Sequence, residues 1–323
     1  METEQTSRRR IAVLTDGNAG NEAQARALAE ALARQMPLRL EICQMDLIGW
    51  AAALPPALLH RTGLTRLGLG SGTLPEEPQL VIGAGRKAAP IVAMLGRNPG
   101  TQAVQLMNPV MPVSAFDAVI APAHDQLNAD NVLSSLGSLS RITSATISTA
   151  QRDWRDRIRP ARKTMAVLIG GPTKSATFGD EEEDALLRSL SGIAETHRLL
   201  VTTSRRTSDA LKQALKLSLG APHFIWTGQG DNPYPAILGF ADTILVTADS
   251  VNMASEAACT GKPVYIFPLR GMNGKLRRFH SALEEHGASR KFAGVLETWS
   301  YHRLAEADRA ASWLLDQLGW RPR

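Results

Sequence analysis

The chain has 323 residues, enough for two domains that each bury a core of their own. Hydrophobic residues make up 44% and charged residues 21%, as in an ordinary soluble globular protein, whereas only 5% are aromatic, which disfavours a base-stacking nucleic-acid surface. The net charge is +5, and the excess lies in the second half, because residues 1–150 hold 12 Lys and Arg against 12 Asp and Glu. A basic second half suits a phosphorylated ligand or an anionic membrane face. We expect no nucleic-acid partner.

Strands and helices alternate in the first half. Apolar runs predict strands at residues 10–16, 38–44, 79–82, 102–106 and 115–121, and helical spacing predicts helices at 21–35 and 87–95. Residues 131–140 are expected to add a shorter strand and a loop. This alternation predicts an α/β fold with a Rossmann-like, doubly wound parallel sheet.

A polar, basic stretch at residues 150–163 predicts the domain boundary, with one domain at 1–150 and another at 151–323. The alternation then resumes. Strands are expected at 165–169, 198–202, 223–226, 243–247 and from 264, with helices at 181–195, 208–217 and 234–240 and after Asp249 or Ser250. The stretches 273–286 and 299–318 are amphipathic, and the last is expected to cross back to the first domain. The chain therefore predicts two Rossmann-like sheets facing a cleft.

The two cysteines, Cys43 and Cys259, lie far apart in apolar stretches, which is typical of buried thiols in a reducing compartment. The N-terminal residues lack the pattern of a signal peptide, and no apolar run is long enough to span a membrane. We therefore expect a cytoplasmic protein, with peripheral contact at the inner face of the membrane as an option. The apolar stretch Leu47–Leu59, with Trp50, is either an acceptor loop that touches lipid or a buried core helix.

The segment Asp16–Asn21 joins the first strand to the first helix, and its glycines let the backbone turn sharply beside a ligand. Asp16 ends a strand at the expected cleft and is the predicted general base. A capped turn without function would use the same residue types. The spacing differs from GxGxxG, which argues against a dinucleotide site. His124, beside Asp125, is a second catalytic candidate, although a lone histidine is more often structural.

Further polar residues follow the strands of the first half and predict an acceptor site. Gly85 and Arg86 open a helix where an acceptor phosphate would bind, unless they are only a solvated helix start. Amides at Gln105 and Asn108 are placed to contact sugar hydroxyls or to form a turn. The predicted acceptor-binding set is Gly17, Asn18, Gly20, Asn21, Gln24, Gly85, Arg86 and Asn108.

In the second half, the stretch 243–269 reads as a strand, a turn, a short helix and another strand. A helix N-terminus at the carboxyl end of a parallel strand is a common anion site. Glu256 lies about two turns into that helix, within reach of a ribose. Arg205 and Arg206 end another strand and predict a diphosphate clamp, because guanidinium groups bind phosphate oxygens in pairs; a hydrophilic loop is the alternative.

Backbone N–H groups of Gly170 and Gly171 are expected to meet phosphate, and the loop at 228–234 to surround the base or sugar. The predicted ligand-binding set of the second half is Gly170, Gly171, Ser204, Arg205, Arg206, Thr207, Gly228, Asn232, Tyr234, Asp249, Ser250, Met253 and Glu256. The Walker spacing is missing, as are DxD and His/Cys clusters, so we expect neither a metal site nor a cofactor.

Ser250, Ser255-Glu256 and Gly261-Lys262-Pro263 resemble the nucleotide-sugar half of GT-B glycosyltransferases, in particular the peptidoglycan N-acetylglucosaminyltransferase type. The resemblance implies that Glu256 binds the ribose hydroxyls of UDP. More of the chain resembles the family named after plant mitochondrial fission ("elongated mitochondria"). The matching segments are DGNAGNEAQ (16–24), GAGRKAAP (83–90), QLMNP (105–109), PAHD (122–125), VLIGGP (167–172), TTSRRT (202–207), GDNPYPAIL (230–238) and TADSVNMASEA (247–257).

These resemblances imply a GT-B fold and a metal-independent glycosyltransferase. It would move a sugar from a nucleoside-diphosphate sugar, UDP first among them, to a hydroxyl of a lipid or envelope glycan. The ligand-binding set of the second half would then bind a nucleotide sugar as co-substrate, and the set of the first half would bind the acceptor. Arg and Lys side chains and a helix dipole then neutralise the leaving diphosphate. Two alternatives stay open: a non-catalytic scaffold, as the plant relatives' recruitment of a division dynamin suggests, and a sugar-nucleotide hydrolase or epimerase.

Overall fold

The computed structural model describes residues 8–159 and 163–321. It divides into two compact units, Met1–Arg141 with Ala305–Arg323, and Ile142–Leu304. Each unit contains a six-stranded sheet in which all pairings are parallel. The two Rossmann-like sheets predicted from the sequence are thereby confirmed.

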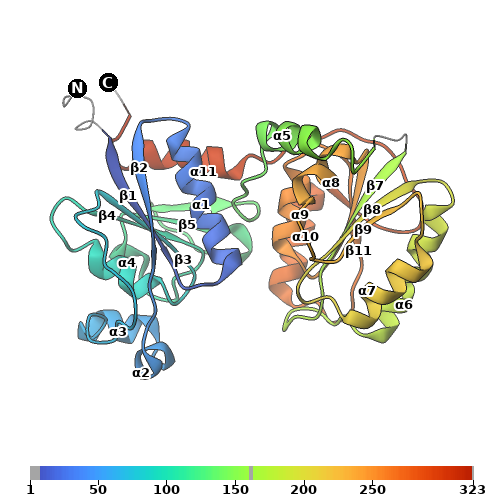
Figure 1. Cartoon of the computed structure of the whole chain (residues 1–323). Coiled ribbons are helices and arrows are strands. Elements are labelled where there is room, and N and C mark those ends of the chain that lie inside the picture. The colour runs from blue at the N-terminus through green and yellow to red at the C-terminus, as the bar shows by residue number, and fades with distance from the viewer. Residues whose placement is uncertain (1–7, 160–162, 322–323) are drawn as a thin grey trace. The chain divides into compact units, whose positions relative to one another are not determined.

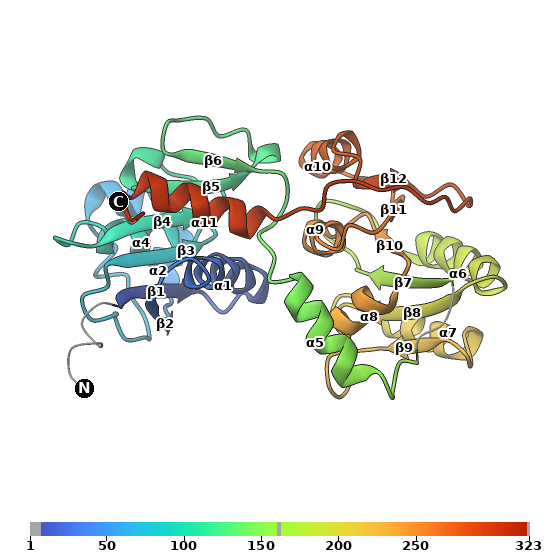
Figure 2. The ribbon, with the colours of Figure 1, turned by 90° about the horizontal axis from the view of Figure 1, so that it is seen from above.

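The first unit alternates short buried strands with helices. Its elements are β1 (Arg9–Thr15), α1 (Ala19–Ala33), β2 (Leu38–Gln44), α2 (Gly49–Ala53), α3 (Pro56–Thr62), β3 (Leu80–Ala84), α4 (Ala89–Leu95), β4 (Gln102–Leu106), β5 (Ala118–Pro122), β6 (Val132–Ser135) and α11 (Glu306–Gln317). The strand order is β2-β1-β3-β4-β5-β6. Helices α1 and α11 lie on one face of this sheet and α4 on the other (Figures 1 and 2).

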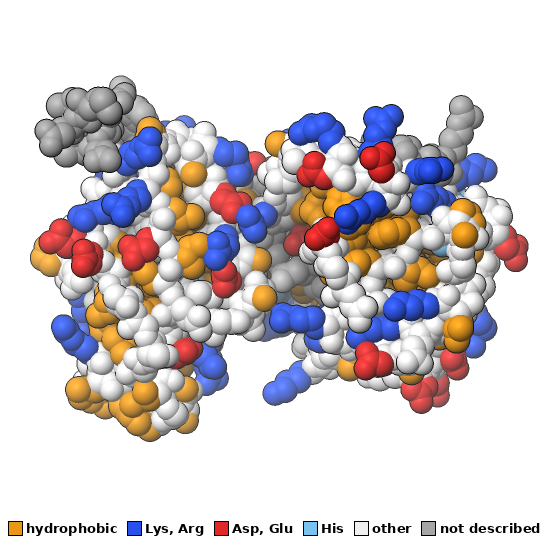
Figure 3. All heavy atoms as spheres, viewed as in Figure 1, with side chains coloured by type: hydrophobic (Ala, Val, Ile, Leu, Met, Phe, Trp, Pro, Cys, Tyr) orange, Lys and Arg blue, Asp and Glu red, His pale blue; other side chains and the backbone are white. Residues whose placement is uncertain are grey.

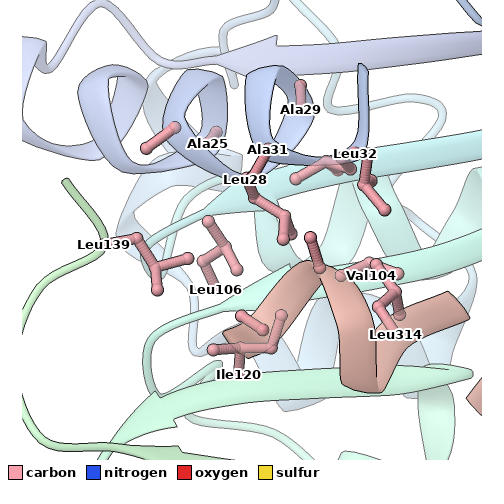
Figure 4. Packing of buried hydrophobic residues seen from close by; sticks show 14 of the residues in the cluster. Ala25, Leu28, Ala29, Ala31, Leu32, Val104, Leu106, Ile120, Leu139 and Leu314 are labelled. Atoms are coloured by element: carbon pink, nitrogen blue, oxygen red, sulfur yellow. The ribbon is translucent and has the colours of Figure 1, made fainter. Parts of the chain in front are cut away.

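The core of the first unit on the α1 side draws on segments far apart in the sequence (Figure 4). Leu28 of α1 and Leu314 of α11 are both fully buried and converge on Val104 of β4. Each such leucine contributes about 1.5–3 kcal/mol by leaving water. Small residues of α1, such as Ala25 and Ala29, let the helix lie close to the sheet. Helix α11 is therefore a structural part of the first unit.

The second unit repeats the alternation. Its elements are α5 (Ser144–Trp154), β7 (Thr164–Ile169), α6 (Asp180–Ala194), β8 (Arg198–Thr203), α7 (Asp209–Ser218), β9 (Phe224–Trp226), α8 (Tyr234–Phe240), β10 (Thr243–Thr247), α9 (Val251–Ala258), β11 (Val264–Phe267), α10 (Gly274–Glu285) and β12 (Ser289–Lys291). The strand order is β12-β11-β10-β7-β8-β9. Right-handed crossovers place α6 and α7 on one face and α8, α9 and α10 on the other (Figures 1 and 2).

The structure differs from the sequence expectation at three places. The expected boundary after residue 150 falls inside helix α5, which belongs to the second unit, and the units separate after Arg141. Helix α5 was not predicted because it is rich in Ser and Thr, which are poor helix formers. Thr143 and Thr146 form its capping box. The stretch 47–59 forms two short helices, α2 and α3, instead of one. The three-residue edge strand β12 was not predicted.

Cys43 and Cys259 are both buried and form no disulfide within the described residues, as their apolar surroundings predict. Burial raises the pKa of the Cys43 thiol to about 11, with the charge of Glu41 adding to the effect. None of the helices within the described ranges is both long and apolar enough to cross a membrane.

Candidate functional site

The second sheet has its topological switch point between β7 and β10, because the chain runs outward from these neighbours in opposite directions. In open parallel sheets a ligand binds at the carboxyl end of the strands at such a point. Here Gly170 follows β7, and Asp249 and Ser250 follow β10. The carboxyl end of β8, with Ser204 and Arg205, lies on the far side of β7. Two strand spacings separate β8 from β10, about 10 Å.

The carboxylate of Asp249 is the centre of this edge. Its side chain is fully buried, and Oδ2 accepts from the Gly171 amide at 3.0 Å and from Arg206 Nη2 at 2.8 Å. Its other oxygen, Oδ1, accepts from the Thr247 hydroxyl at 2.7 Å. Three donors compensate the desolvation of the buried charge. Asp249 therefore holds the ends of β7, β8 and β10 together rather than meeting a ligand.

The two glycines after β7 were predicted to donate their amides to phosphate, and the structure corrects this. The Gly170 amide donates to Thr247 Oγ1 at 2.8 Å, and the Gly171 amide donates to Asp249. Only glycine fits at positions 170 and 171, because a Cβ atom would clash with neighbouring atoms. A Cβ atom on Gly170 would lie 2.0 Å from Asp249 Oδ2, and one on Gly171 would lie 2.3 Å from the Arg206 carbonyl oxygen.

Arg205 and Arg206, which were predicted to clamp a diphosphate together, differ in their contacts. Arg206 donates to the Gly171 carbonyl at 2.8 Å and to Asp249, so its guanidinium group is held by the protein. Arg205 is exposed and has no side-chain partner among the described residues. Thr207 is buried, and its hydroxyl donates to backbone carbonyls of β7 and Gly170. Ser204 Oγ accepts from the Arg206 amide at 3.1 Å. Arg205 is thus the available cation at this strand end.

Helix α9 starts at the switch point. Ser250 is its N-cap, and the Ser250 hydroxyl accepts from the Met253 amide at 3.3 Å. The sequence identified Asp249 or Ser250 as the cap, and the structure selects Ser250. The positive end of the helix dipole therefore lies at the carboxyl edge of the sheet, where it favours an anion. Glu256 lies six residues further, about 9 Å along the helix axis.

Glu256 is half-buried and paired with a second predicted residue. The Tyr234 hydroxyl, from the start of α8, donates to Glu256 Oε2 at 2.7 Å. Burial raises the pKa of Glu256 to about 7, and the hydrogen bond from Tyr234 acts in the opposite direction. Burial, together with the charge of Glu256, raises the pKa of Tyr234 well above its ordinary value. Tyr234 fixes one carboxylate oxygen, and Oε1 accepts no hydrogen bond from the residues that the structure describes.

The loop before α8 is exposed. Asn232 Oδ1 accepts from the Tyr234 amide at 3.0 Å, a local turn that sets the start of the helix. Gly228 has φ +97°, a conformation that favours glycine. Asn232 therefore positions Tyr234 at the start of α8.

Sequence reasoning missed His280 in helix α10. Its Nε2 lies 2.7 Å from the Ala248 carbonyl oxygen, in the turn between β10 and α9. Since a carbonyl only accepts, Nε2 carries the proton, and Nδ1 has no hydrogen-bond partner in the described part of the chain. Burial lowers the pKa of His280, and the charge of Asp249 opposes that shift. His280 therefore supports the turn that places Ser250, and nothing in the linear sequence links the two residues.

The first sheet has its own switch point, between β1 and β3. The predicted base Asp16 follows β1, is partly buried, and accepts through Oδ1 from the Asn18 amide at 3.1 Å. Asn18 in turn caps α1 and accepts from the amides of Gly20 and Asn21. Gly17 has φ +76°. The turn is thus a capped helix start, in which Asp16 Oδ2 accepts no hydrogen bond from the described residues.

Gly85, after β3, lies against the start of α1. A Cβ atom on Gly85 would sit 2.5 Å from Asn21 Nδ2, and its φ is +81°. Gln105, predicted to contact sugar hydroxyls, is instead fully buried and donates to the carbonyls of Gly85 and Leu106. Arg86 is exposed beside them. The structure therefore brings Asn21, Gly85 and Arg86 to one edge and removes Gln105 from it.

The remaining predicted residues of the first unit follow β4 and β5. Asn108 Oδ1 accepts from the Val110 amide at 2.8 Å and so forms a turn. Gln24 Nε2 lies 3.7 Å from Met107 Sδ, which ties α1 to that turn. His124 lies in a single 3-10 turn, Ala123–Asp125, at the end of β5. All these residues lie at the carboxyl edge of the first sheet. Within the described ranges, His, Cys, Asp and Glu form no group of three or more that suits a metal ion.

Known proteins resemble this chain over most of its length. The model of the family described as "Mitochondrial fission ELM1" matches residues 19–318. The Mitochondrial fission protein ELM1 of Arabidopsis thaliana is 31% identical over 280 residues, 76% of this chain and 66% of the plant protein. The match thus spans just under two thirds of the plant relative. An uncharacterized protein of Rickettsia prowazekii (strain Madrid E) is 29% identical over 93% of this chain and 96% of its own length.

Solved structures with the same fold include enzymes of sugar nucleotides. The UDP-GlcNAc 2-epimerase from Methanocaldococcus jannaschii has a TM-score of 0.57 at 13% identity, over 95% of this chain and 99% of that one. The S. aureus MnaA-UDP co-structure has a TM-score of 0.54 at 14% identity, over 97% and 91%. The glycotransferase of kitacinnamycin has a TM-score of 0.53 at 13% identity, over 96% and 91%. At such identities the likeness establishes the fold, shared by GT-B glycosyltransferases and epimerases.

Proposed function

The chain belongs to the mitochondrial fission ELM1 family, and from this membership and the GT-B-like fold we propose that it transfers a sugar from a nucleoside-diphosphate sugar to a hydroxyl acceptor. The second unit would hold the nucleotide, UDP first among the candidates. Two fold relatives have been solved with UDP, one of them also with UDP-GlcNAc, and we extend that ligand class to this chain. No metal is required by the proposal.

The observation that carries the proposal is the edge formed by Arg205, Ser250 and Glu256. An exposed guanidinium group follows β8, the N-terminus of α9 lies at the switch point, and a partly buried carboxylate lies about 9 Å along α9. A diphosphate would meet the cation and the helix dipole, while a ribose hydroxyl would donate to Glu256 Oε1. The ion pair of the buried Asp249 with Arg206 keeps the three strand ends in place. A scaffold has no need for an unpaired cation and a half-buried carboxylate at this position.

Two groups would carry the chemistry. Arg205 and the α9 dipole would stabilise the negative charge on the departing diphosphate. Asp16, through its unclaimed Oδ2, would take the proton of the acceptor hydroxyl. The nucleophile attacks the anomeric carbon, the bond from that carbon to the diphosphate oxygen breaks, and the acceptor proton passes to the carboxylate. Losing such a base typically slows a reaction by about 10²- to 10⁴-fold.

A thermal-shift screen with UDP-, GDP-, ADP- and CMP-sugars tests the ligand class, because a ligand of the folded state raises the melting temperature. We expect a shift with one of the diphosphate sugars and a weaker one with the CMP-sugar. Release of the nucleoside diphosphate, with glycerol as a model acceptor, then measures turnover. Asp16→Asn should keep the shift and lose turnover; full turnover in this variant contradicts the role of Asp16. If none of the sugar nucleotides produces a shift, the proposed ligand class is wrong.

The family name and the fold relatives each support one alternative. The name of the plant relative favours a non-catalytic role in organelle fission, for which binding without turnover would be the result. The epimerases among the fold relatives favour interconversion of the sugar. In that case the screen would yield an isomeric sugar nucleotide without transfer to glycerol.

A further inference from the structure

Residues 47–70 of the first unit form an ordered projection that the proposed reaction does not use; we call it the apolar projection. It consists of α2, α3 and the following loop. The Ile48 amide donates to the Gly68 carbonyl at 2.9 Å, and the Gly70 amide donates to the Asp46 carbonyl at 2.8 Å. Leu59 is 1% exposed and anchors α3 in the unit. These contacts fix both ends of the projection, so its outer side chains have defined positions.

The outer side of the apolar projection is hydrophobic. It carries four of the nine large exposed hydrophobic side chains in the described part of the chain, namely Ile48 (37% exposed), Trp50 (45%), Leu58 (43%) and Leu67 (71%). Figure 3 shows hydrophobic side chains gathered over α2 and α3, at the lower left of the view. A Cβ atom on Gly68 would lie 3.5 Å from Trp50 Cη2, so the chain next to Leu67 passes beside the indole ring. These side chains therefore belong to one surface.

The charged side chains of the apolar projection are all positive. From Leu47 to Pro75 the sequence contains neither Asp nor Glu, while Arg61 and Arg66 are both exposed. Neither arginine has a side-chain partner among the described residues. Arg97, from the loop after α4, adds a third cation, because its Nη2 donates to the His60 carbonyl at 3.4 Å. The apolar side chains thus share the projection with cations that no acidic side chain of the projection neutralises.

We propose that the apolar projection docks on the surface of an anionic lipid bilayer. Trp50, Leu58 and Leu67 would enter the boundary between headgroups and acyl chains, where Trp is favoured. Arg61 and Arg66 would meet the lipid phosphates, because cations near an anionic leaflet are attracted to it. The helices are far too short to span a bilayer, so the contact is peripheral.

A second copy of this chain fits the surface less well. A two-fold contact through the apolar projection would bring each patch against itself, so that Arg61 and Arg66 would face arginines of the other copy. Like charges across an interface oppose association. An anionic membrane matches both the apolar side chains and the arginines of the surface. Docking through the apolar projection does not depend on the sugar-nucleotide site in the second unit.

Co-sedimentation with vesicles tests the proposal. We expect the full chain to bind vesicles of phosphatidylcholine with phosphatidylglycerol, and to bind phosphatidylcholine alone weakly. Trp50→Ser should weaken partitioning into the anionic vesicles by about tenfold, because the indole buries a large apolar area. Arg61→Gln and Arg66→Gln should each weaken partitioning into the anionic vesicles by about fivefold. Added salt should weaken the binding of the wild type to these vesicles. Leu217→Ser, on α7 of the second unit, removes an 87% exposed leucine and is the matched control.

The variants change exposed side chains, so circular dichroism and an unchanged melting temperature should show that they are folded. Equal binding to both kinds of vesicle, or equal loss in Leu217→Ser and Trp50→Ser, would overturn the proposal. So would a concentration-dependent dimer in analytical ultracentrifugation that Trp50→Ser dissociates, since the patch would then serve a second copy. The UDP affinity of Trp50→Ser should equal that of the wild type, which separates this outcome from failure of the nucleotide site.

Discussion

The Tyr234 hydroxyl donates a hydrogen bond of 2.7 Å to Glu256 Oε2 and joins the start of α8 to the second turn of α9. This contact orients the carboxylate that we assign to the ribose and leaves Oε1 for a ligand. Burial raises the pKa of Glu256 to about 7, so its carboxyl group changes charge near neutral pH. Burial of this carboxylate therefore makes binding and stability depend on pH.

Stability should fall as pH rises through the titration of Glu256. Its pKa is about 7 in the folded chain and 4.5 in the unfolded reference, so the folded state holds more protons between these values. The free energy of unfolding then decreases with rising pH, by at most about 3 kcal/mol. Urea denaturation of the wild type and Glu256→Gln at several pH values measures this. A slope in Glu256→Gln as steep as in the wild type would assign the effect to another group.

Binding should depend on pH in the opposite sense. A ribose hydroxyl donates more strongly to an ionised carboxylate, so UDP affinity should rise as pH increases through about 7. In Glu256→Gln this rise should disappear, and affinity above pH 7 should drop by about tenfold or more. Glu284→Gln, an exposed glutamate of α10, is the control. A pH profile shared by both variants would argue against contact between Glu256 and the ligand.

Arg205 and Arg206 should respond differently to substitution by alanine. Arg205 is exposed and unpaired among the described residues, so Arg205→Ala should weaken UDP binding by about tenfold and leave stability unchanged. Arg206 is paired with the buried Asp249, so Arg206→Ala should cost about 1–3 kcal/mol of unfolding free energy. Equilibrium denaturation and calorimetric titration of both variants separate the two roles. Equal stability losses in the two would contradict them.

Gly85 should resist substitution because of both its conformation and its neighbour. Its φ is +81°, and a Cβ atom would lie 2.5 Å from Asn21 Nδ2. We expect Gly85→Ala to lower the free energy of unfolding by about 1–3 kcal/mol. Gly192→Ala in α6 is the control, since a Cβ there meets nothing within 4 Å. Thermal denaturation of both variants is the measurement, and a stable Gly85→Ala would refute the predicted strain.

The sequence predicts the fold well because buried parallel strands have a distinct composition. Thr243–Thr247 is an unbroken apolar and β-branched run, and it forms β10 with the predicted bounds. Helix α5 was not expected because Ser and Thr carry low helix propensity, and only its tertiary packing against α8 secures it. Edge strand β12 has no periodic pattern that would reveal it.

The site was harder to predict, because residue type does not show what a polar group contacts. Gly170 and Gly171 were expected to bind phosphate, yet their amides donate to Thr247 and Asp249, across a strand pairing that sequence spacing does not reveal. In the same way, Arg205 and Arg206 look equivalent in the sequence and differ only in which one reaches Asp249. The residues that follow strand ends could be predicted, but their hydrogen-bond partners could not.

Isothermal titration calorimetry with UDP, UMP and uridine tests the central claim most directly, namely that the carboxyl edge of the second sheet binds a nucleoside diphosphate. We predict that the wild type binds UDP more tightly than UMP, and UMP more tightly than uridine. Arg205→Ala should weaken UDP binding by about tenfold and leave uridine unaffected, whereas Arg155→Ala, another exposed arginine, should change neither. Equal affinity of the wild type for all three compounds, or UDP binding unchanged by Arg205→Ala, would contradict the account.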